Sequence, residues 1–189
     1  LTYADTDRLS QNFAAYLQNR LGVRKGDRIA VMLPNIPAFP LAMLGIVRAD
    51  AVQVNVNPLY TPRELEHQLN DAGVETIVIF SGVSATFAEI INKTAIKHVI
   101  TALPGDGTGA KLPGPAVDGR LTDTTGFADA LQQGADLKFT PVRLSGHDLL
   151  FLQYTGGTTG LSKGAALSHR NLVANTEQFK AFVQPHVRR

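Results

Sequence analysis

One short run holds the residues best suited to chemistry, and it follows an apolar stretch predicted to be a strand. After residues 149–154, the next six residues, 155–160, are all glycine or threonine, and Lys163 follows three residues later. Glycines let backbone amides face an anion with no side chain in the way, and threonine hydroxyls add neutral donors. Lys163 adds a full positive charge, and hydrogen bonds to charged groups contribute about 1.5–3 kcal/mol each. The combination predicts a polyphosphate site.

Other interpretations of the glycine clusters fit less well. An ordinary turn between strands rarely needs so many donors. A Walker A loop requires glycine, four residues, then Gly-Lys and Ser or Thr, whereas here two residues separate Gly160 from Lys163 and Gly164 follows the lysine. A second cluster, residues 105–110, matches the loose dinucleotide pattern G-x-G-x-x-A. Prolines follow it at 113 and 115 and prevent the helix that this pattern must open, so no dinucleotide site is predicted.

Two polar residues after the run have two equally supported interpretations. Ser168 is a suitable N-cap for a helix that ends near Phe182, which places His169 and Arg170 in its first turn. These two residues could orient the substrate or the loop, or they could be ordinary polar residues of a first turn. The other histidines lack the spacing of a metal site, so no metal cluster is predicted from them.

Composition limits the class of protein. The chain has 189 residues, of which 44% are hydrophobic and 18% are charged, as in an ordinary globular protein. It contains no cysteine, which excludes a disulfide scaffold, a thiolate metal site and a cysteine nucleophile. The formal net charge of +2 is too small for a general nucleic-acid footprint, so no nucleic-acid partner is predicted.

The elements that must position the run alternate between strands and helices. Thr61, Pro62 and Glu64 form a strong helix start, because Thr61 can cap the amides and Glu64 completes a capping box. Such alternation predicts an α/β fold, with a mostly parallel sheet flanked by helices. Strands are predicted over about 28–33, 51–56, 76–80 and 97–101, and helices over about 9–21, 37–48, 61–72 and 86–91.

Some stretches depart from this alternation. Residues 29–47 are apolar enough to imitate a membrane span, but three prolines favour a buried strand, a turn and a buried helix. Residues 102–120 hold five glycines and three prolines, which predicts a surface excursion or partial disorder, and a short helix is expected over 127–132. We therefore predict an α/β N-terminal subdomain over residues 1–145, then a strand, phosphate loop and helix of the next subdomain over 146–189.

The motifs together resemble the adenylate-forming superfamily, which includes acyl-CoA synthetases, luciferases and peptide-synthetase adenylation domains. Residues 154–164 look like its phosphate loop and 167–172 like the segment after it, while 54–65 are similar to bacterial long-chain fatty-acid–CoA ligases. The resemblance covers the whole chain and implies part of the large N-terminal domain of such an enzyme. The phosphate-binding residues that it implies are Tyr154, Thr155, Gly156, Gly157, Thr158, Thr159, Gly160, Leu161, Ser162, Lys163, Gly164 and Ala165.

The resemblance also implies a two-step reaction with ATP and coenzyme A as co-substrates. A fatty carboxylate attacks the α-phosphate of ATP and pyrophosphate leaves, and the thiol of coenzyme A then captures the acyl-adenylate. Thr158 is the magnesium contact that the resemblance implies. Ser162 stands where many relatives have proline, which loosens the loop without removing a donor. The implied protein is cytoplasmic, and its substrate class is compatible with peripheral contact with the inner membrane.

The length of the chain sets it apart from the family that it resembles. It stops at Arg189, whereas family members continue for several hundred residues. We therefore expect an N-terminal fragment that lacks the C-terminal domain, holds no complete catalytic set and does not catalyse adenylation alone. A truncated sheet should expose apolar surface, so we expect self-association. Alternatives are an aryl or short-chain acyl-CoA ligase, a self-sufficient nucleotide hydrolase or kinase, and a non-catalytic nucleotide-binding or interaction module.

Overall fold

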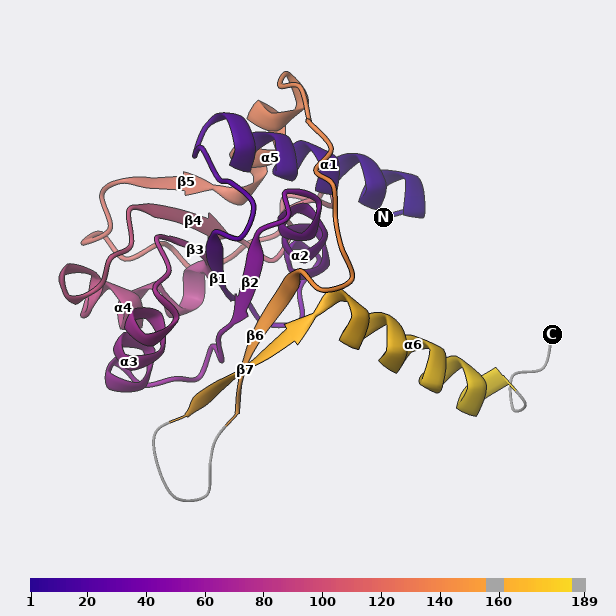
Figure 1. Cartoon of the computed structure of the whole chain (residues 1–189). Coiled ribbons are helices and arrows are strands. Elements are labelled where there is room, and N and C mark those ends of the chain that lie inside the picture. The colour runs from indigo at the N-terminus through magenta and orange to yellow at the C-terminus, as the bar shows by residue number, and fades with distance from the viewer. Residues whose placement is uncertain (156–161, 185–189) are drawn as a thin grey trace.

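The computed structural model describes residues 1–155 and 162–184, and seven strands in this part of the chain form one sheet (Figure 1). They are β1 (Arg28–Met32), β2 (Val52–Asn55), β3 (Thr76–Phe80), β4 (His98–Ala102), β5 (Thr124–Gly126), β6 (Leu149–Thr155) and β7 (Lys163–Ser168). Their order is β5-β4-β3-β1-β2-β6-β7, and every neighbouring pair is parallel except β6 and β7. The mostly parallel sheet predicted from the sequence is confirmed.

Helices cover both faces of this sheet, and each face has its own apolar core. The helices α1 (Tyr3–Asn19), α2 (Ala38–Arg48) and α5 (Phe127–Ala135) pack on one face, where Ile29 and Val31 of β1 contribute to the core. The helices α3 (Pro62–Ala72) and α4 (Ser84–Ala88) pack on the other, with Ala30 and Met32 of β1. Successive residues of a strand face opposite sides, so a strand buried on both faces is apolar throughout. Two short 3₁₀ helices, Ser81–Val83 and Ile91–Lys93, complete this layer.

Local signals in the sequence account for several of these elements. Thr61 accepts a hydrogen bond from the backbone of Glu64, the Glu64 side chain accepts one from the Thr61 backbone, and Gly73 ends α3 with φ 61°. The predicted capping box and stop are therefore confirmed. The apolar stretch at 29–47 divides into β1 and α2, as predicted. Among the described residues, no helix is long and apolar enough to cross a bilayer.

The glycine-rich and proline-rich stretch forms no regular element, also as predicted. Residues 103–123 contain only turns and irregular backbone between β4 and β5. No helix follows the glycine cluster at 105–110, so that cluster does not form a dinucleotide-binding fingerprint. The helix expected over 127–132 is present and extends to Ala135.

Two strands were not anticipated from the sequence, and both lie outside the central apolar strands. β5 has only three residues and lies at one edge, and β7 has the weakly β-forming sequence Lys-Gly-Ala-Ala-Leu-Ser at the other. β7 is held by antiparallel pairing with β6, which in turn pairs in parallel with β2. The strands after residue 146 therefore extend the same sheet, and a subdomain boundary near 145 stays a prediction.

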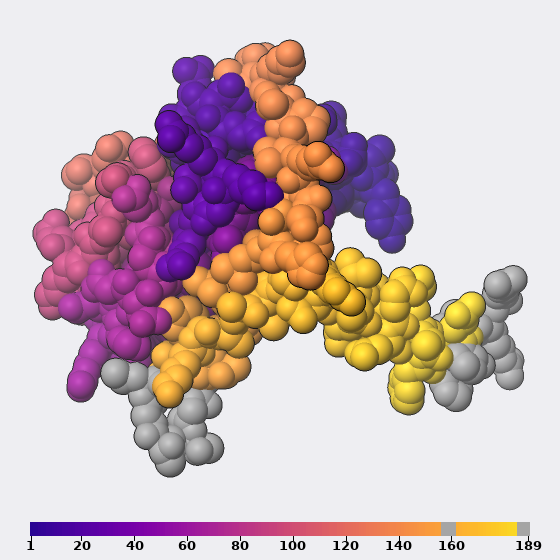
Figure 2. All heavy atoms as spheres, in the orientation of Figure 1, coloured from indigo at the N-terminus to yellow at the C-terminus, as the bar shows by residue number. Residues whose placement is uncertain are grey.

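The last helix, α6 (His169–Val183), begins as the sequence predicts and stands away from the sheet. Ser168 caps it by accepting a hydrogen bond from the Asn171 backbone. None of its residues is buried, and Figure 2 shows it projecting from the body of the molecule. The helix carries exposed apolar side chains, among them Leu172 and Phe179.

Candidate functional site

The hairpin of β6 and β7 frames the predicted phosphate loop. Tyr154 lies opposite Gly164, and Thr155 lies opposite Lys163, so the structure brings these four residues together as cross-strand neighbours. Ala165 lies opposite Gln153, and Ser162 precedes β7. The remaining predicted loop residues, Gly156, Gly157, Thr158, Thr159, Gly160 and Leu161, lie outside the described residues, and so does the magnesium contact expected at Thr158.

The loop end of the hairpin extends past β2, the parallel neighbour of β6. β2 ends at Asn55, which lies opposite Gln153 of β6, so Tyr154 and Thr155 continue beyond the end of β2. Thr155 and Lys163 are both exposed there. In open α/β sheets, ligands bind outside the carboxyl ends of the parallel strands. The hairpin thus presents a hydroxyl and a cation where a ligand of such a sheet is expected.

Tyr154 sits on the opposite face of the sheet from Gln153 and Thr155, packed towards α3. It is 8% exposed, and its hydroxyl donates a hydrogen bond of 2.5 Å to Oδ2 of Asp71 in the last turn of α3. Burial, followed by this hydrogen bond and the Asp71 charge, raises the pKa of the Tyr154 phenol. Tyr154 therefore stays protonated and donates.

Three side-chain amides form a hydrogen-bonded row on the other face of β2 and β6. Nε2 of Gln53 donates to Oδ1 of Asn55 at 2.6 Å, and Nδ2 of Asn55 donates to Oε1 of Gln153 at 2.7 Å. Gln68 of α3 donates to the backbone oxygen of Asn55 at 2.8 Å. The bond from Asn55 to Gln153 ties the carboxyl end of β2 to β6, and the bond from Gln68 ties it to α3. Polar residues two apart in strands that are otherwise apolar are the signal that could have found them, whereas no sequence signal indicated Asp71.

His169 and Arg170 lie at the opposite end of the hairpin from the loop. The backbone N–H of His169 donates to the backbone oxygen of Asp148 at 3.1 Å, and that of Arg170 donates to the backbone oxygen of Gly146 at 2.9 Å. His169 follows Lys163 by six positions along β7, which at about 3.4 Å per residue is a distance of roughly 20 Å. The structure does not bring these two residues to Thr155 or Lys163. Their position agrees with the interpretation as ordinary residues of a first turn.

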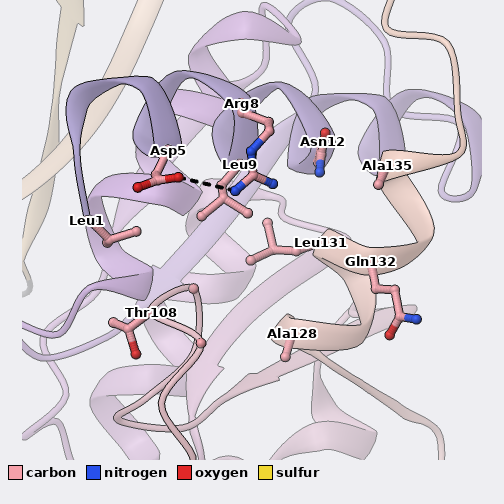
Figure 3. A pocket seen from close by; sticks show the side chains of 12 residues that line it. Leu1, Asp5, Arg8, Leu9, Asn12, Thr108, Ala128, Leu131, Gln132 and Ala135 are labelled. Carbon is pink, nitrogen blue, oxygen red and sulfur yellow. Dashed lines mark hydrogen bonds and ion pairs between the residues drawn. The ribbon is translucent and has the colours of Figure 1, made fainter.

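A pocket of about 430 Å³ lies between α1, α5 and the second glycine cluster (Figure 3). Leu9 and Leu131 give it apolar walls, and Arg8 at its edge forms an ion pair of 3.3 Å with Asp5. None of the predicted phosphate contacts that the structure describes lines it. In Figure 1, α1 and α5 lie on the other side of the molecule from the hairpin end. Among the described residues, no three His, Asp or Glu side chains gather as a metal site.

Comparison with known proteins gives consistent matches over the whole chain. The model of the AMP-binding enzyme family matches residues 1–189. The long-chain-fatty-acid–CoA ligases of Salmonella typhimurium and Escherichia coli O157:H7 are 45% and 46% identical to 98% of this chain, which covers 35% of each. The ligase of the same name from Bacillus subtilis is 36% identical to 97% of it.

A solved structure agrees with these sequence matches. The crystal structure of a long-chain-fatty-acid–CoA ligase from Archaeoglobus fulgidus superimposes with a TM-score of 0.76 at 28% identity, over 95% of this chain and 32% of that one. The chain thus spans about a third of the length of the relatives that it matches.

Proposed function

Since this chain belongs to the AMP-binding enzyme family, we propose that it serves, within an intact protein, the ATP-dependent ligation of a long-chain fatty acid to coenzyme A. The names of the relatives that are 45% and 46% identical support this substrate class. In the first step, a carboxylate oxygen bonds to the α-phosphorus of ATP, and pyrophosphate leaves with the electron pair of the broken P–O bond. In the second, the thiol of coenzyme A loses its proton, its sulfur bonds to the acyl carbon, and AMP leaves with the electron pair of the broken C–O bond.

The observation that carries the proposal is the position of Thr155 and Lys163 at the loop end of the hairpin. Backbone amides and hydroxyls of the loop would bind the phosphates that leave as pyrophosphate, and Lys163 would neutralise their charge. Fixed donors aimed at developing charge stabilise such a transition state without forming bonds to the substrate. The proposal extends to Gly156, Gly157, Thr158, Thr159, Gly160 and Leu161, which lie outside the described residues.

We also propose that Thr158 contacts the magnesium ion that accompanies ATP. The hydroxyl of Thr158 is a hard oxygen ligand of the kind that Mg²⁺ accepts, usually alongside waters and substrate phosphates. Because Thr158 lies outside the described residues, this assignment is supported by its chemistry and by the family resemblance alone.

Calorimetric titration with pyrophosphate and with ATP tests the phosphate site. Lys163→Ala should weaken pyrophosphate binding about 10- to 100-fold, because it removes a charge-assisted hydrogen bond. Lys111→Ala is the matched control, since Lys111 is also exposed and lies in the segment between β4 and β5, away from the hairpin. Equal loss in both variants, or no binding by the parent chain, would contradict the proposed function.

An activity assay separates this proposal from a self-sufficient enzyme. We expect no fatty-acid-dependent release of pyrophosphate from the 189-residue chain, although it binds pyrophosphate. Turnover comparable to that of a complete ligase would show that the chain holds a full catalytic set. Binding without turnover also distinguishes the chain from an interaction module that has lost nucleotide affinity.

We further propose that the chain self-associates through α6 and that the intact protein works in the cytoplasm, where ATP and coenzyme A are used. The exposed apolar side chains of α6 support self-association.

Peripheral contact with the inner membrane is proposed from the substrate class alone, because a net charge of +2 gives little attraction to anionic lipid. Sedimentation with vesicles of anionic lipid tests that contact.

A further inference from the structure

Tyr154 is the first residue of the predicted phosphate loop, and it is buried. Its ring belongs to the apolar cluster beneath α3, together with Leu65 and Leu69, whereas the next residue, Thr155, is exposed. Successive strand residues face opposite sides, so the Tyr154 ring points away from the face that carries Gln153 and Thr155. The ring therefore marks the point where β6 leaves the core and the loop begins.

Asp71 holds the hydroxyl end of this ring from a helix that is itself fixed. The hydrogen bond from Tyr154 to Asp71 joins residues 83 positions apart in the sequence. One residue further along α3, the backbone oxygen of Ala72 accepts a hydrogen bond of 2.6 Å from Nη1 of Arg28, at the start of β1. The end of α3 is thus tied to the sheet, and through Asp71 it is tied to the start of the loop as well.

Gly164 of β7 lies close to the same ring. A Cβ atom at position 164 would lie 2.9 Å from Cε2 of Tyr154, which real Cβ atoms essentially never do, and 3.0 Å from its Cζ. Gly164 is not among the glycines with positive φ, so space rather than backbone conformation requires a glycine there. Because Gly164 lies opposite Tyr154, the ring holds β6 and β7 in contact one residue pair before Thr155 and Lys163.

We infer that Asp71, Tyr154 and Gly164 form a clamp that positions the phosphate loop, and that the Tyr154 hydroxyl does not itself contact the nucleotide. This inference rests on the proposed function. The hydroxyl of Tyr154 donates its proton to Asp71, on the α3 side of the sheet. The same proton is therefore not available to a phosphate at the loop end of the hairpin. Asp71 and Gly164 are positioning residues: without the clamp, Thr155 and Lys163 would have to be brought together on binding, and affinity would fall.

A double-mutant cycle on pyrophosphate binding tests the clamp in the 189-residue chain. Tyr154→Phe and Asp71→Ala should each raise the Kd about three- to tenfold, and the double variant should be no weaker than the weaker single one. Asp71→Asn keeps an acceptor oxygen and should restore most of the affinity. Gly164→Ala should weaken binding at least as much, because it displaces the ring.

Tyr16→Phe is the matched control. It also removes the hydroxyl of a buried tyrosine, which donates at 3.3 Å to Thr125 Oγ1 on the α1 side, far from the hairpin. It should leave the Kd unchanged, even where the urea midpoint falls. Parent-like affinity of Tyr154→Phe and Asp71→Ala, or additive effects in their double variant, would overturn the clamp.

Hydrogen exchange keeps this test separate from that of the proposed function. If the parent chain binds no pyrophosphate, the proposed function fails, and the clamp is judged by exchange of the β6 and β7 amides without ligand. Faster exchange there in both Tyr154→Phe and Asp71→Ala, with α1 and α5 unchanged, supports a clamp on the hairpin. Unchanged exchange in the hairpin overturns it.

Discussion

The ammonium of Lys25 lies 2.6 Å from Oδ2 of Asp148, which links the turn before β1 to the residue that precedes β6. The same ammonium lies 2.5 Å from Oδ2 of Asp50, with which it forms a second ion pair. Asp50 is 2% exposed and adopts φ 54° at the end of α2. Lys25 thus links three segments at the end of the sheet opposite the loop: the turn before β1, the connection from α2 to β2, and the segment before β6.

This cluster predicts a pH dependence of stability on the acid side. The hydrogen bond from Lys25, and then that from the Ser145 backbone, lower the pKa of Asp148. A carboxylate whose pKa is lowered by folding stabilises the fold above its unfolded pKa of about 3.9, and this contribution is lost as pH falls through the folded pKa. Asp148→Asn should therefore be less stable than the parent at pH 7 and should lose less stability on acidification below about pH 4.

Urea unfolding at a series of pH values measures this difference. Lys25→Met should lose more stability than Asp148→Asn at pH 7, because it also leaves the buried carboxylate of Asp50 without its cation. Parallel pH profiles for the parent and Asp148→Asn would contradict the assigned role of the Lys25 pair.

The contact between α5 and α1 predicts a strong effect of one methyl group. A Cβ atom at Gly134 would lie 1.9 Å from the backbone oxygen of Asn12. Although alanine favours helices over glycine by about 1 kcal/mol, Gly134→Ala should lower the free energy of unfolding by about 1–3 kcal/mol, because α5 must move off α1.

Gly119→Ala provides the comparison for this substitution. A Cβ atom there meets nothing within 4 Å, and Gly119 has no positive φ. Its stability should equal or exceed that of the parent in the same urea titration. If Gly134→Ala is as stable as Gly119→Ala, the close approach of α5 to α1 is not the constraint that the geometry indicates.

Elements set by local interactions could be predicted from the sequence, whereas those set by distant partners could not. The ends of α3 were predictable because Thr61, Glu64 and Gly73 act within a few residues of one another. The central strands were predictable because burial on both faces makes them continuously apolar. The alternation of these elements was enough to indicate the parallel sheet.

The remaining features depend on partners that are distant in the sequence. Asp71 meets Tyr154 across 83 positions, and no local pattern distinguishes Asp71 from other exposed residues of a helix. β7 has no alternation of apolar and polar residues, and its pairing with β6 makes it a strand. The same pairing places His169 at the far end of the hairpin, although it follows Lys163 by only six residues.

The cap of α3 predicts a modest and selective loss of stability. Thr61→Ala removes the hydroxyl that accepts from the Glu64 backbone and should cost about 1 kcal/mol, the usual value of an N-cap. Thr61→Ser keeps the acceptor and should cost far less in the same urea titration. Asp71 lies at the other end of α3 from this cap, so the pyrophosphate affinity of the folded Thr61→Ala variant should stay close to that of the parent. An equal stability loss in both variants would mean that the cap is not the source.

The exposed face of α6 predicts self-association that charge can abolish. Leu172 and Phe179 are 45% and 64% exposed and lie seven residues apart, which places them on one face of the helix. A second copy of this face would bury both side chains. The double substitution Leu172→Glu with Phe179→Glu should weaken association at least about tenfold, because two charges would then be buried at the contact. Gln178→Glu adds charge away from this face and should leave association unchanged. Light scattering over micromolar concentrations measures the effect, and a parent chain that stays monomeric throughout that range contradicts the role given to α6.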